Sequence, residues 1–344
     1  MKEETSIDSY SENKVHPLVS VILPMKNAAD TVSKAIDSII HQSYPNLEII
    51  IINDHSTDTS SDIVGNYDDK RIKIVNNNDV GIAAALNTGI AIASGKYIAR
   101  MDADDVSHKD RIEKQVRFLE DNSKVGVVSC LVNHISHTNH QEGYRLHVDW
   151  INSITEPTDH YLNRFADATV AHPSVLFRRE LIEKYGNYNT GSVPEDFEFW
   201  LRLMSQGVRF AKVPEVLFDW HDTPTRASRE LVQYEQEAFF RVKAQYFAQW
   251  WSEKSFNKDL WIWGFGKNVF RKSQPLNDLG IKITGYIDLN ERDNTTRNVK
   301  SYREIPHING FYLVYVSDRI GKRNIINYLE KQKLIPGGDF LIMA

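Results

Sequence analysis

Three carboxylates gather near the end of residues 96–106, where a short apolar run leads into Asp102, Asp104 and Asp105. Two carboxylates in an Asp-x-Asp turn repel each other unless a cation lies between them. Mg²⁺ and Mn²⁺ take oxygen ligands and usually keep coordination sites for substrate phosphates. The pattern therefore predicts a divalent-cation site, and a solvated acidic turn is the alternative.

A second pair of carboxylates, Glu195 and Asp196, begins a predicted helix directly after Pro194. Ser192 lies three residues before Glu195, which is the spacing of a capping box. Acidic residues in a first helical turn also complement the helix dipole. The chemical alternative is that one carboxylate at the mouth of a crevice acts as a general base. The local pattern leaves both roles open and makes Asp196 the candidate base.

Apolar runs alternate with helical patterns over the first part of the chain, which predicts an α/β fold with a mostly parallel sheet. Predicted strands cover residues 18–23, 47–52, 71–75 and 97–101, and predicted helices cover 31–41, 59–67, 81–93 and 110–121. Asp54 follows the second strand, and the acidic turn follows the fourth. Since parallel strands end at one edge of a sheet, these carboxylates should line one crevice with the first loop, residues 24–27.

Further along, residues 125–130, 171–177 and 213–217 read as strands, whereas residues 133–163 show weak periodicity. We expect that weakly periodic segment to be irregular and to act as an acceptor-side loop or lid. The first loop has neither a Gly-x-Gly-x-x-Gly motif nor a P-loop, so no dinucleotide cofactor is predicted there.

Composition narrows the function classes. The chain has 344 residues, a net charge of −5 and one cysteine, which gives no reason to expect nucleic acid, a disulfide framework or a thiolate metal cluster. No apolar run approaches the roughly 18 residues of a membrane span. Residues 1–17 are polar and are expected to form a disordered tail without a signal peptide. We expect a cytoplasmic protein, with peripheral contact at the inner face of the membrane left open.

The second half predicts a long helix over residues 230–251 and then a small Rossmann-like domain. The helix carries many aromatic residues, which suits a helix bridging two packed parts, and a membrane-surface helix is the alternative. Gly264 and Gly266 follow a predicted strand, and Asp288 ends the next, which makes half of a dinucleotide fingerprint. These three residues are a candidate second nucleotide site. Alternatively, the glycines only form the turn, and the domain has a positioning role.

Taken together, the motifs resemble those of the family 2 inverting glycosyltransferases, which have the GT-A nucleotide-diphospho-sugar transferase fold. The resemblance covers about residues 18–228. Its motifs lie at residues 19–24, 52–58, 95–99, 101–105, 172–174 and 195–200, and at Gly81, Asn87 and Gly89.

The resemblance implies roles for the donor-side residues. Pro24 and Asn27 match first-loop positions that border the nucleotide, and Asp54 matches the carboxylate that hydrogen-bonds the base, usually uracil. Asp104 matches the carboxylate that ligates Mn²⁺ or Mg²⁺. Asp102, the first residue of the pair, is implied to contact the ribose and is also a candidate metal ligand.

It also implies roles on the acceptor and phosphate side. Asp196 matches the general base, and His221 lies where related enzymes sometimes place a further metal ligand. Arg226 and Arg229 are candidate clamps for the diphosphate. His55 is a departure, because the family usually has glycine there, and it brings a side chain close to the base pocket.

The implied activity is metal-dependent, inverting transfer of a sugar from a nucleotide-diphospho-sugar, most often UDP-linked, to a hydroxyl of a glycan or lipid-linked glycan. A sugar-1-phosphate nucleotidyltransferase is one alternative, but it needs a glycine-rich basic first loop, and residues 24–31 have no glycine and one lysine. A non-catalytic nucleotide-sugar-binding protein of the same fold is the other. The expected organisation is a tail (1–17), a GT-A domain (18–228), a helical linker (229–257) and the small domain (258–344).

Overall fold

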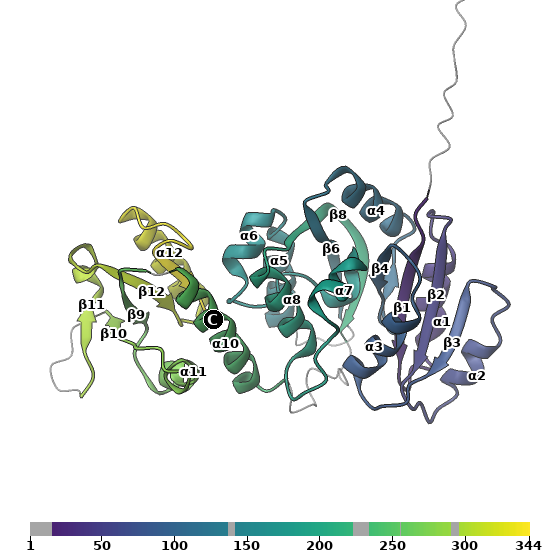
Figure 1. Ribbon diagram of the computed structural model, residues 1–344, viewed down its shortest axis with the longest axis horizontal. Helices are drawn as coiled ribbons and strands as arrows, with labels where there is room; N and C mark the ends of the chain where they lie inside the picture. The colour runs from purple at the N-terminus through teal and green to yellow at the C-terminus, as the bar shows by residue number, and fades with distance from the viewer. Residues whose placement is uncertain (1–15, 137–141, 223–233, 255, 290–295) are drawn as a thin grey trace, which may run out of the picture.

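The computed structural model describes residues 16–136, 142–222, 234–254, 256–289 and 296–344. These residues form two sheets with helices packed around them (Figure 1). Most of the predicted tail, residues 1–15, lies outside the described residues.

The first sheet has eight strands in the order β3-β2-β1-β4-β7-β6-β8-β5. They are β1 (Val19–Met25), β2 (Leu47–Asn53), β3 (Ile72–Asn76), β4 (Tyr97–Arg100), β5 (Val106–Ser107), β6 (Val125–Ser136), β7 (Leu176–Arg178) and β8 (Arg209–Asp222). The β1–β2, β2–β3, β1–β4 and β6–β8 pairs are parallel, and β7 and β5 pair only antiparallel with their neighbours. The α/β class is confirmed, with a mixed sheet.

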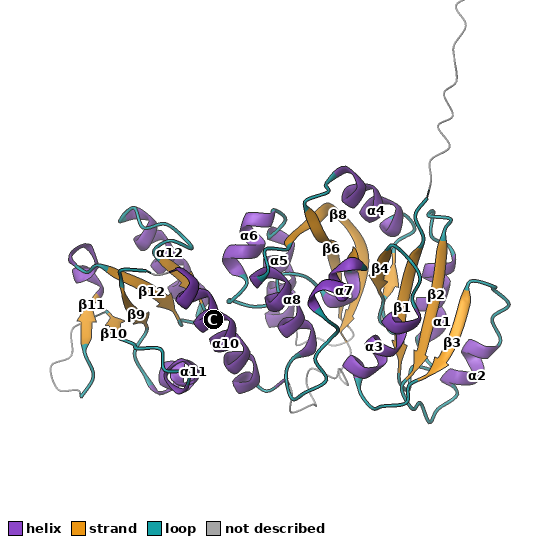
Figure 2. Cartoon of the chain, viewed as in Figure 1, coloured by secondary structure: helices purple, strands orange, loops and turns teal. Residues whose placement is uncertain are grey.

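Helices cover both faces of this sheet (Figure 2). They are α1 (Val32–Ile40), α2 (Ser60–Gly65), α3 (Ile82–Ile92), α4 (Arg111–Asp121), α5 (Glu142–Ser153), α6 (Pro157–Asn163), α7 (Glu180–Tyr185) and α8 (Glu195–Ser205). The strand β2 shows how the faces divide: Ile49 and Ile51 pack with α1 and α4, whereas Ile50 and Ile52 pack with α3 and α8. This alternation follows from the two-residue period of a strand.

The prediction of an irregular segment over residues 133–163 is wrong. The strand β6 continues to Ser136, and α5 and α6 follow it. The helix α5 buries Val148 and Ile151 in the core, and its Asn152 side chain both donates to and accepts from the Val132 backbone, at 2.8 and 3.0 Å. Tyr144 and Trp150 of α5 also pack against this core. The hydrogen bonds of Asn152 add to this packing, and a search for apolar periodicity does not detect them.

The second sheet has five parallel strands in the order β11-β10-β9-β12-β13. They are β9 (Asp259–Trp263), β10 (Gly285–Asp288), β11 (Val299–Ser301), β12 (Gly310–Val314) and β13 (Phe340–Ile342). The helix α11 (Lys267–Asp278) links β9 to β10, and α12 (Arg319–Lys331) links β12 to β13. Numbered along the chain, the order is 3-2-1-4-5, as in Rossmann-like sheets.

The helix α10 (Gln236–Lys254) lies between the two sheets (Figure 1). Its Phe240, Phe247 and Trp250 are buried in one core with Phe197 of α8 and Phe311 of β12. These three buried aromatic residues thus join the two parts of the chain, as the bridging interpretation predicts. Within the described residues, no helix is long and apolar enough to cross a membrane.

A buried carboxylate, Glu48 of β2, fixes the approach to β4. It accepts hydrogen bonds from Ser20 and from the Ser94 backbone N–H (2.7 Å), and it pairs with Lys73 at 2.7 Å. Burial alone would raise its pKa, but the bonds from Lys73, Ser20 and Ser94 outweigh burial and lower the pKa to about 2. Gly95 follows, and a Cβ there would lie 2.7 Å from the Ser20 backbone nitrogen, so only glycine fits.

The Glu48→Gln variant should lower the free energy of unfolding at pH 7 by about 1–3 kcal/mol, because an amide cannot replace the charge-assisted bonds. A depressed pKa gives stability that is present above about pH 4.3, the unfolded value, and is lost as the pH falls toward 2. The difference between variant and wild type, measured by urea unfolding, should therefore shrink over that range.

The matched control is Glu183→Gln, which removes an exposed surface pair with Arg179 (3.3 Å) and should change stability by less than about 1 kcal/mol. Equal losses for the two variants at pH 7 would contradict a stabilising role for the Glu48 network.

Candidate active site

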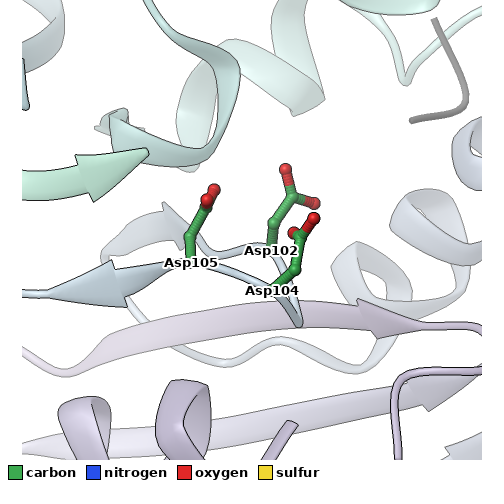
Figure 3. Close-up of side chains that lie close together, drawn as sticks. All are labelled: Asp102, Asp104 and Asp105. Atoms are coloured by element: carbon green, nitrogen blue, oxygen red, sulfur yellow. The ribbon is translucent and has the colours of Figure 1, made fainter. Parts of the chain in front are cut away.

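The acidic turn lies between β4 and β5, with Asp102, Asp104 and Asp105 on one side of it (Figure 3). One carboxylate oxygen from each residue lies within 4.8 Å of the others. Asp105 is buried, and Asp102 and Asp104 are partly exposed. Three hard oxygen donors at this spacing fit a divalent cation such as Mn²⁺ or Mg²⁺, which would be held between them and remain open to a ligand. The predicted cluster is therefore present.

Arg100, the last residue of β4, is a functional residue that the sequence analysis did not identify. Its side chain is 4% exposed and forms an ion pair with Asp102. The charge of Arg100 also favours the ionised forms of Glu195 and Asp196, so it acts on both carboxylate groups of the site. The signal that identifies it is a single arginine in an otherwise apolar strand that leads into three acids.

A second buried cation, Arg111 of α4, fixes the backbone around the turn. Its NH1 donates to the carbonyl oxygens of Arg100 (3.3 Å) and Pro173 (2.9 Å), and its guanidinium lies 5.1 Å from the centre of the Phe218 ring. Burial lowers its pKa to about 10. Arg111 thus ties the end of β4 to the short helix η1 (His172–Ser174).

His221, predicted as a metal ligand, lies beside the acidic turn near the end of β8. Its backbone N–H donates to Asp105 Oδ1 at 2.8 Å, and its ring Nδ1 lies 3.9 Å from the same oxygen. The three-donor cluster is formed by the aspartates without this ring. The metal-ligand role of His221 therefore stays a prediction. Arg226 and Arg229, the predicted clamps, lie outside the described residues.

The predicted nucleotide end of the crevice is built around Asp54, which is 4% exposed. Its carboxylate accepts hydrogen bonds from Asn77 Nδ2 (2.8 Å) and from the Gly81 backbone N–H (3.1 and 3.2 Å). Lys26 Nζ lies 3.9 Å away. Asp54 therefore organises the loops around it, and its predicted contact with a base stays a prediction.

Two residues of this end adopt backbone conformations that favour glycine or asparagine. Asn27 has φ +49° and His55 has φ +61°. The Asn27 side chain accepts a hydrogen bond from the Thr57 N–H at 2.8 Å, which joins the first loop to the loop after β2. Pro24 is buried within β1. The left-handed conformation at His55 explains why glycine suits this position.

The predicted acceptor end of the site lies at the start of α8. This helix begins at Glu195, with Pro194 as its N-cap residue and no side-chain hydrogen bond to cap it. The predicted capping box of Ser192 and Glu195 is therefore wrong. Glu195 is instead buried, and its two carboxylate oxygens accept from the Tyr234 hydroxyl at 2.6 and 2.7 Å. Burial and the neighbouring Asp196 charge raise the pKa of Glu195.

Asp196 is partly exposed, and its Oδ1 accepts a hydrogen bond from the Phe197 N–H at 2.7 Å. Burial raises its pKa, and Asp167 adds to this effect. A carboxylate with a raised pKa at a helix N-terminus is a good candidate for accepting a proton near neutral pH.

Buried polar contacts connect these two ends. The His172 ring lies 3.0 Å (Nε2) from the Tyr188 hydroxyl, and Asn87 of α3 both donates to and accepts from the Tyr188 backbone, at 2.9 and 3.0 Å. Arg100 and Asp196 both act on the pKa of Tyr188, which burial raises. The family-type residues Asn87 and His172 thus meet at one tyrosine. By contrast, Gly264 and Gly266 lie in the turn after β9, and Asp288 ends β10, so the candidate second nucleotide site lies at the second sheet and stays a prediction.

Comparison with known proteins places this site in a family. The model described as "Glycosyl transferase family 2" matches residues 20–186. An uncharacterized glycosyltransferase of Rickettsia prowazekii is 32% identical over 295 residues, which cover 80% of this chain and 83% of that protein.

Other relatives match in part. An uncharacterized glycosyltransferase of Haemophilus influenzae is 48% identical over 112 residues, covering 32% of this chain and 35% of that protein. The putative teichuronic acid biosynthesis glycosyltransferase TuaG of Bacillus subtilis is 42% identical over 110 residues, covering 31% of this chain and 44% of that protein. The chain thus matches less than half of the length of these two relatives.

Solved structures share the fold. TarS 1–349 from S. aureus in complex with UDP-GlcNAc has a TM-score of 0.56 and 16% identity, covering 76% of this chain and 70% of that chain. The mannosyltransferase PcManGT from Pyrobaculum calidifontis, in complex with GDP-Man and Mn²⁺, has a TM-score of 0.50 and 23% identity, covering 78% and 70%. With the family match and the Rickettsia relative, the conclusion is that this chain belongs to glycosyl transferase family 2 and has the GT-A fold.

Proposed function

We propose that this chain transfers a sugar from a nucleotide-diphospho-sugar to a hydroxyl group of a glycan or lipid-linked glycan. The proposed nucleotide of the donor is UDP. The observation that carries the proposal is the cluster of three carboxylates at the end of β4, with their oxygens within 4.8 Å. Family membership supports glycosyl transfer rather than nucleotidyl transfer or binding alone. The complexes of the two structural neighbours, with UDP-GlcNAc and with GDP-Man and Mn²⁺, support the donor class.

On the donor side, Asp104 and Asp102 would hold Mn²⁺ or Mg²⁺, with Asp105 beside them. The bound cation supplies neutralisation of the negative charge that develops on the leaving diphosphate. Arg100 places a positive charge next to Asp102 and forms an ion pair with it. Asp54 and Asn27 shape the loops that would border the nucleotide.

On the acceptor side, Asp196 would take the proton from the acceptor hydroxyl as that oxygen attacks the anomeric carbon. Its raised pKa suits a base that must hold a proton and then release it. Glu195 suits this role less well, because it is buried and both its oxygens accept from Tyr234. Attack from the side opposite the leaving group in a single displacement inverts the anomeric configuration.

We also propose an organisation and a location. The transferase domain would cover residues 18–228, the linker 229–257 and the small domain 258–344. The name of the relative TuaG mentions teichuronic acid biosynthesis, which supports a glycan as the acceptor. A glycan or lipid-linked glycan acceptor suits a protein working in the cytoplasm at the inner face of the membrane.

The Asp104→Asn variant should lose the effect of Mn²⁺ on nucleotide binding. In wild type, Mn²⁺ should tighten UDP binding at least about tenfold, equivalent to about 1.4 kcal/mol, and the variant should show less than about twofold. Isothermal titration calorimetry with UDP, with and without Mn²⁺, measures this. The control is Asp110→Asn, an exposed aspartate six residues away, which should behave as wild type. A full Mn²⁺ effect in Asp104→Asn would refute the metal site.

The Asp196→Asn variant should lower the transfer rate by about 10²-fold or more, since general bases contribute about 10²–10⁴. UDP binding with Mn²⁺ should stay within about twofold of wild type. In wild type, kcat/KM should fall as the pH drops through a pKa higher than the ordinary aspartate value of about 3.9, because only the ionised form accepts a proton.

Asp159→Asn on α6, an exposed carboxylate, is the matched control and should keep wild-type rates. Rates in Asp196→Asn near those of wild type, or a product that NMR shows to retain the anomeric configuration of the donor, would contradict the assigned base and the single displacement.

A further inference from the structure

The first turn of α8 carries the candidate base, Asp196, but its own sequence supplies no cap for it. Pro194 is the N-cap residue, and no side-chain hydrogen bond caps the helix. Asp196 Oδ1 accepts a hydrogen bond from the adjacent Phe197 N–H at 2.7 Å. A helix start without a side-chain cap depends on other contacts to fix its first turn. The position of the Asp196 carboxylate therefore depends on contacts from elsewhere in the chain.

One such contact reaches the residue directly before the base. Tyr234, two residues before α10, donates its hydroxyl to both carboxylate oxygens of Glu195, at 2.6 and 2.7 Å. Glu195 is 3% exposed, and burying a carboxylate is costly unless it is hydrogen-bonded. Burial and the Asp196 charge raise the pKa of Glu195, whereas the bond from Tyr234 lowers it. The tyrosine hydroxyl therefore favours the ionised, buried form of Glu195.

A second contact holds the residue directly after the base. The helix α10 lies beside α8 (Figure 1). The Phe239 and Phe197 ring centres are 5.4 Å apart, and Lys243 Nζ lies 5.5 Å from the centre of the Phe197 ring. Phe197 is 1% exposed. Both sequence neighbours of Asp196 are thus held by the segment 234–243.

A second tyrosine makes the same kind of bond farther along α8. Tyr246 of α10 donates its hydroxyl to Glu198 Oε1 at 2.5 Å. Glu198 also accepts two hydrogen bonds of 3.1 Å from Arg202. At 3.6 residues per turn, Glu198 lies about 200° around the helix from Asp196, whereas Glu195 lies only about 100° from it. Tyr246 therefore holds the same helix on the side away from the candidate base.

We propose that Tyr234 is a positioning residue for the transfer step: through Glu195 it fixes the first turn of α8 and thereby the carboxylate of Asp196. The proposal rests on the proposed function, in which Asp196 takes the proton of the acceptor. Tyr234 acts through Glu195 and not on the reacting atoms. Misplacing a reacting group by about 1 Å can cost about 10²-fold in rate. The effect of Tyr234 should therefore appear in kcat and not in donor binding.

The Tyr234→Phe variant removes only the hydroxyl. Turnover is measured as release of UDP or GDP from UDP-GlcNAc, UDP-glucose and GDP-mannose with Mn²⁺, with water as the acceptor. Tyr234→Phe should lower kcat at least about tenfold. The KM for the donor and the affinity for UDP with Mn²⁺ should stay within about twofold of wild type, because the hydroxyl acts on the chemical step.

The matched control is Tyr246→Phe, which removes an equivalent bond to a buried carboxylate of the same helix. It should lower the free energy of unfolding as Tyr234→Phe does, but keep kcat within about twofold of wild type. This comparison separates the position of the base from the general stability of the helix pair.

A double-mutant cycle tests whether Tyr234 acts through Glu195. Urea unfolding is measured for wild type, Tyr234→Phe, Glu195→Gln and the double variant. The effect of Tyr234→Phe on the unfolding equilibrium constant should be at least about threefold smaller in the Glu195→Gln background, because an amide accepts a weaker hydrogen bond than a carboxylate. Equal effects in the two backgrounds would overturn the proposal.

Three kinetic results would overturn the proposal while leaving the proposed function intact, provided that wild type releases nucleotide and Asp196→Asn does not. They are wild-type kcat in Tyr234→Phe, equal losses of kcat in the two tyrosine variants, and a loss confined to KM. By contrast, a wild-type protein that turns over none of the three donors, or wild-type rates in Asp196→Asn, would contradict the proposed function and this inference with it.

Discussion

A single buried cation, Arg100, sets the charge balance on which the rest of the site depends. It pairs with Asp102 on one side and favours ionised Glu195 and Asp196 on the other. Burying a charge without a partner costs several kcal/mol, and carboxylates placed close together disfavour each other's ionised form. Arg111 in turn fixes the Arg100 carbonyl and the Pro173 carbonyl. The acidic turn and the start of α8 are therefore parts of one electrostatic unit, although 90 residues separate them along the chain.

Sequence reasoning predicted the elements whose apolar pattern is strong. The strands β1 to β4 and the helices between them follow from apolar runs such as the four isoleucines of β2. The acidic turn could be predicted because a parallel sheet brings strand ends together. Pro24, however, does not end β1, which runs to Met25. Its missing N–H faces the β4 side, where pairing stops at Ile22 with Arg100, so the proline breaks no ladder bond there.

The rest was not predictable because it depends on contacts between distant residues. In the sequence, Arg100 is one charged residue at the end of an apolar strand. Its partners, Asp102 and the two carboxylates at the start of α8, are evident only in the fold. Glu195 looks like a capping residue until Tyr234, 39 positions later, bonds to its carboxylate. The helix α5 lies in a stretch of weak apolar periodicity, and its hydrogen bonds from Asn152 to β6 become evident only in the fold. The chemical role of each of these residues follows only from contacts that form in the tertiary fold.

The two sheets are also joined energetically. Phe197 of α8 and Phe240 of α10 share a core with Phe311 of β12. Asp167 acts on the pKa of Asp196 in the first part and on Lys243 and Lys322 beside the second. Small-domain residues and the candidate base thus lie within electrostatic reach of one carboxylate.

The central claim is that the acidic turn holds the metal that binds the donor diphosphate. The most direct measurement is a crystal structure of the protein with Mn²⁺ and UDP, with the metal located by its anomalous scattering. We expect one Mn²⁺ at about 2.1 Å from an Asp104 oxygen, bridging to the diphosphate, with Arg100 still paired to Asp102. A manganese ion bound elsewhere, or a diphosphate bound away from the acidic turn, would contradict the account.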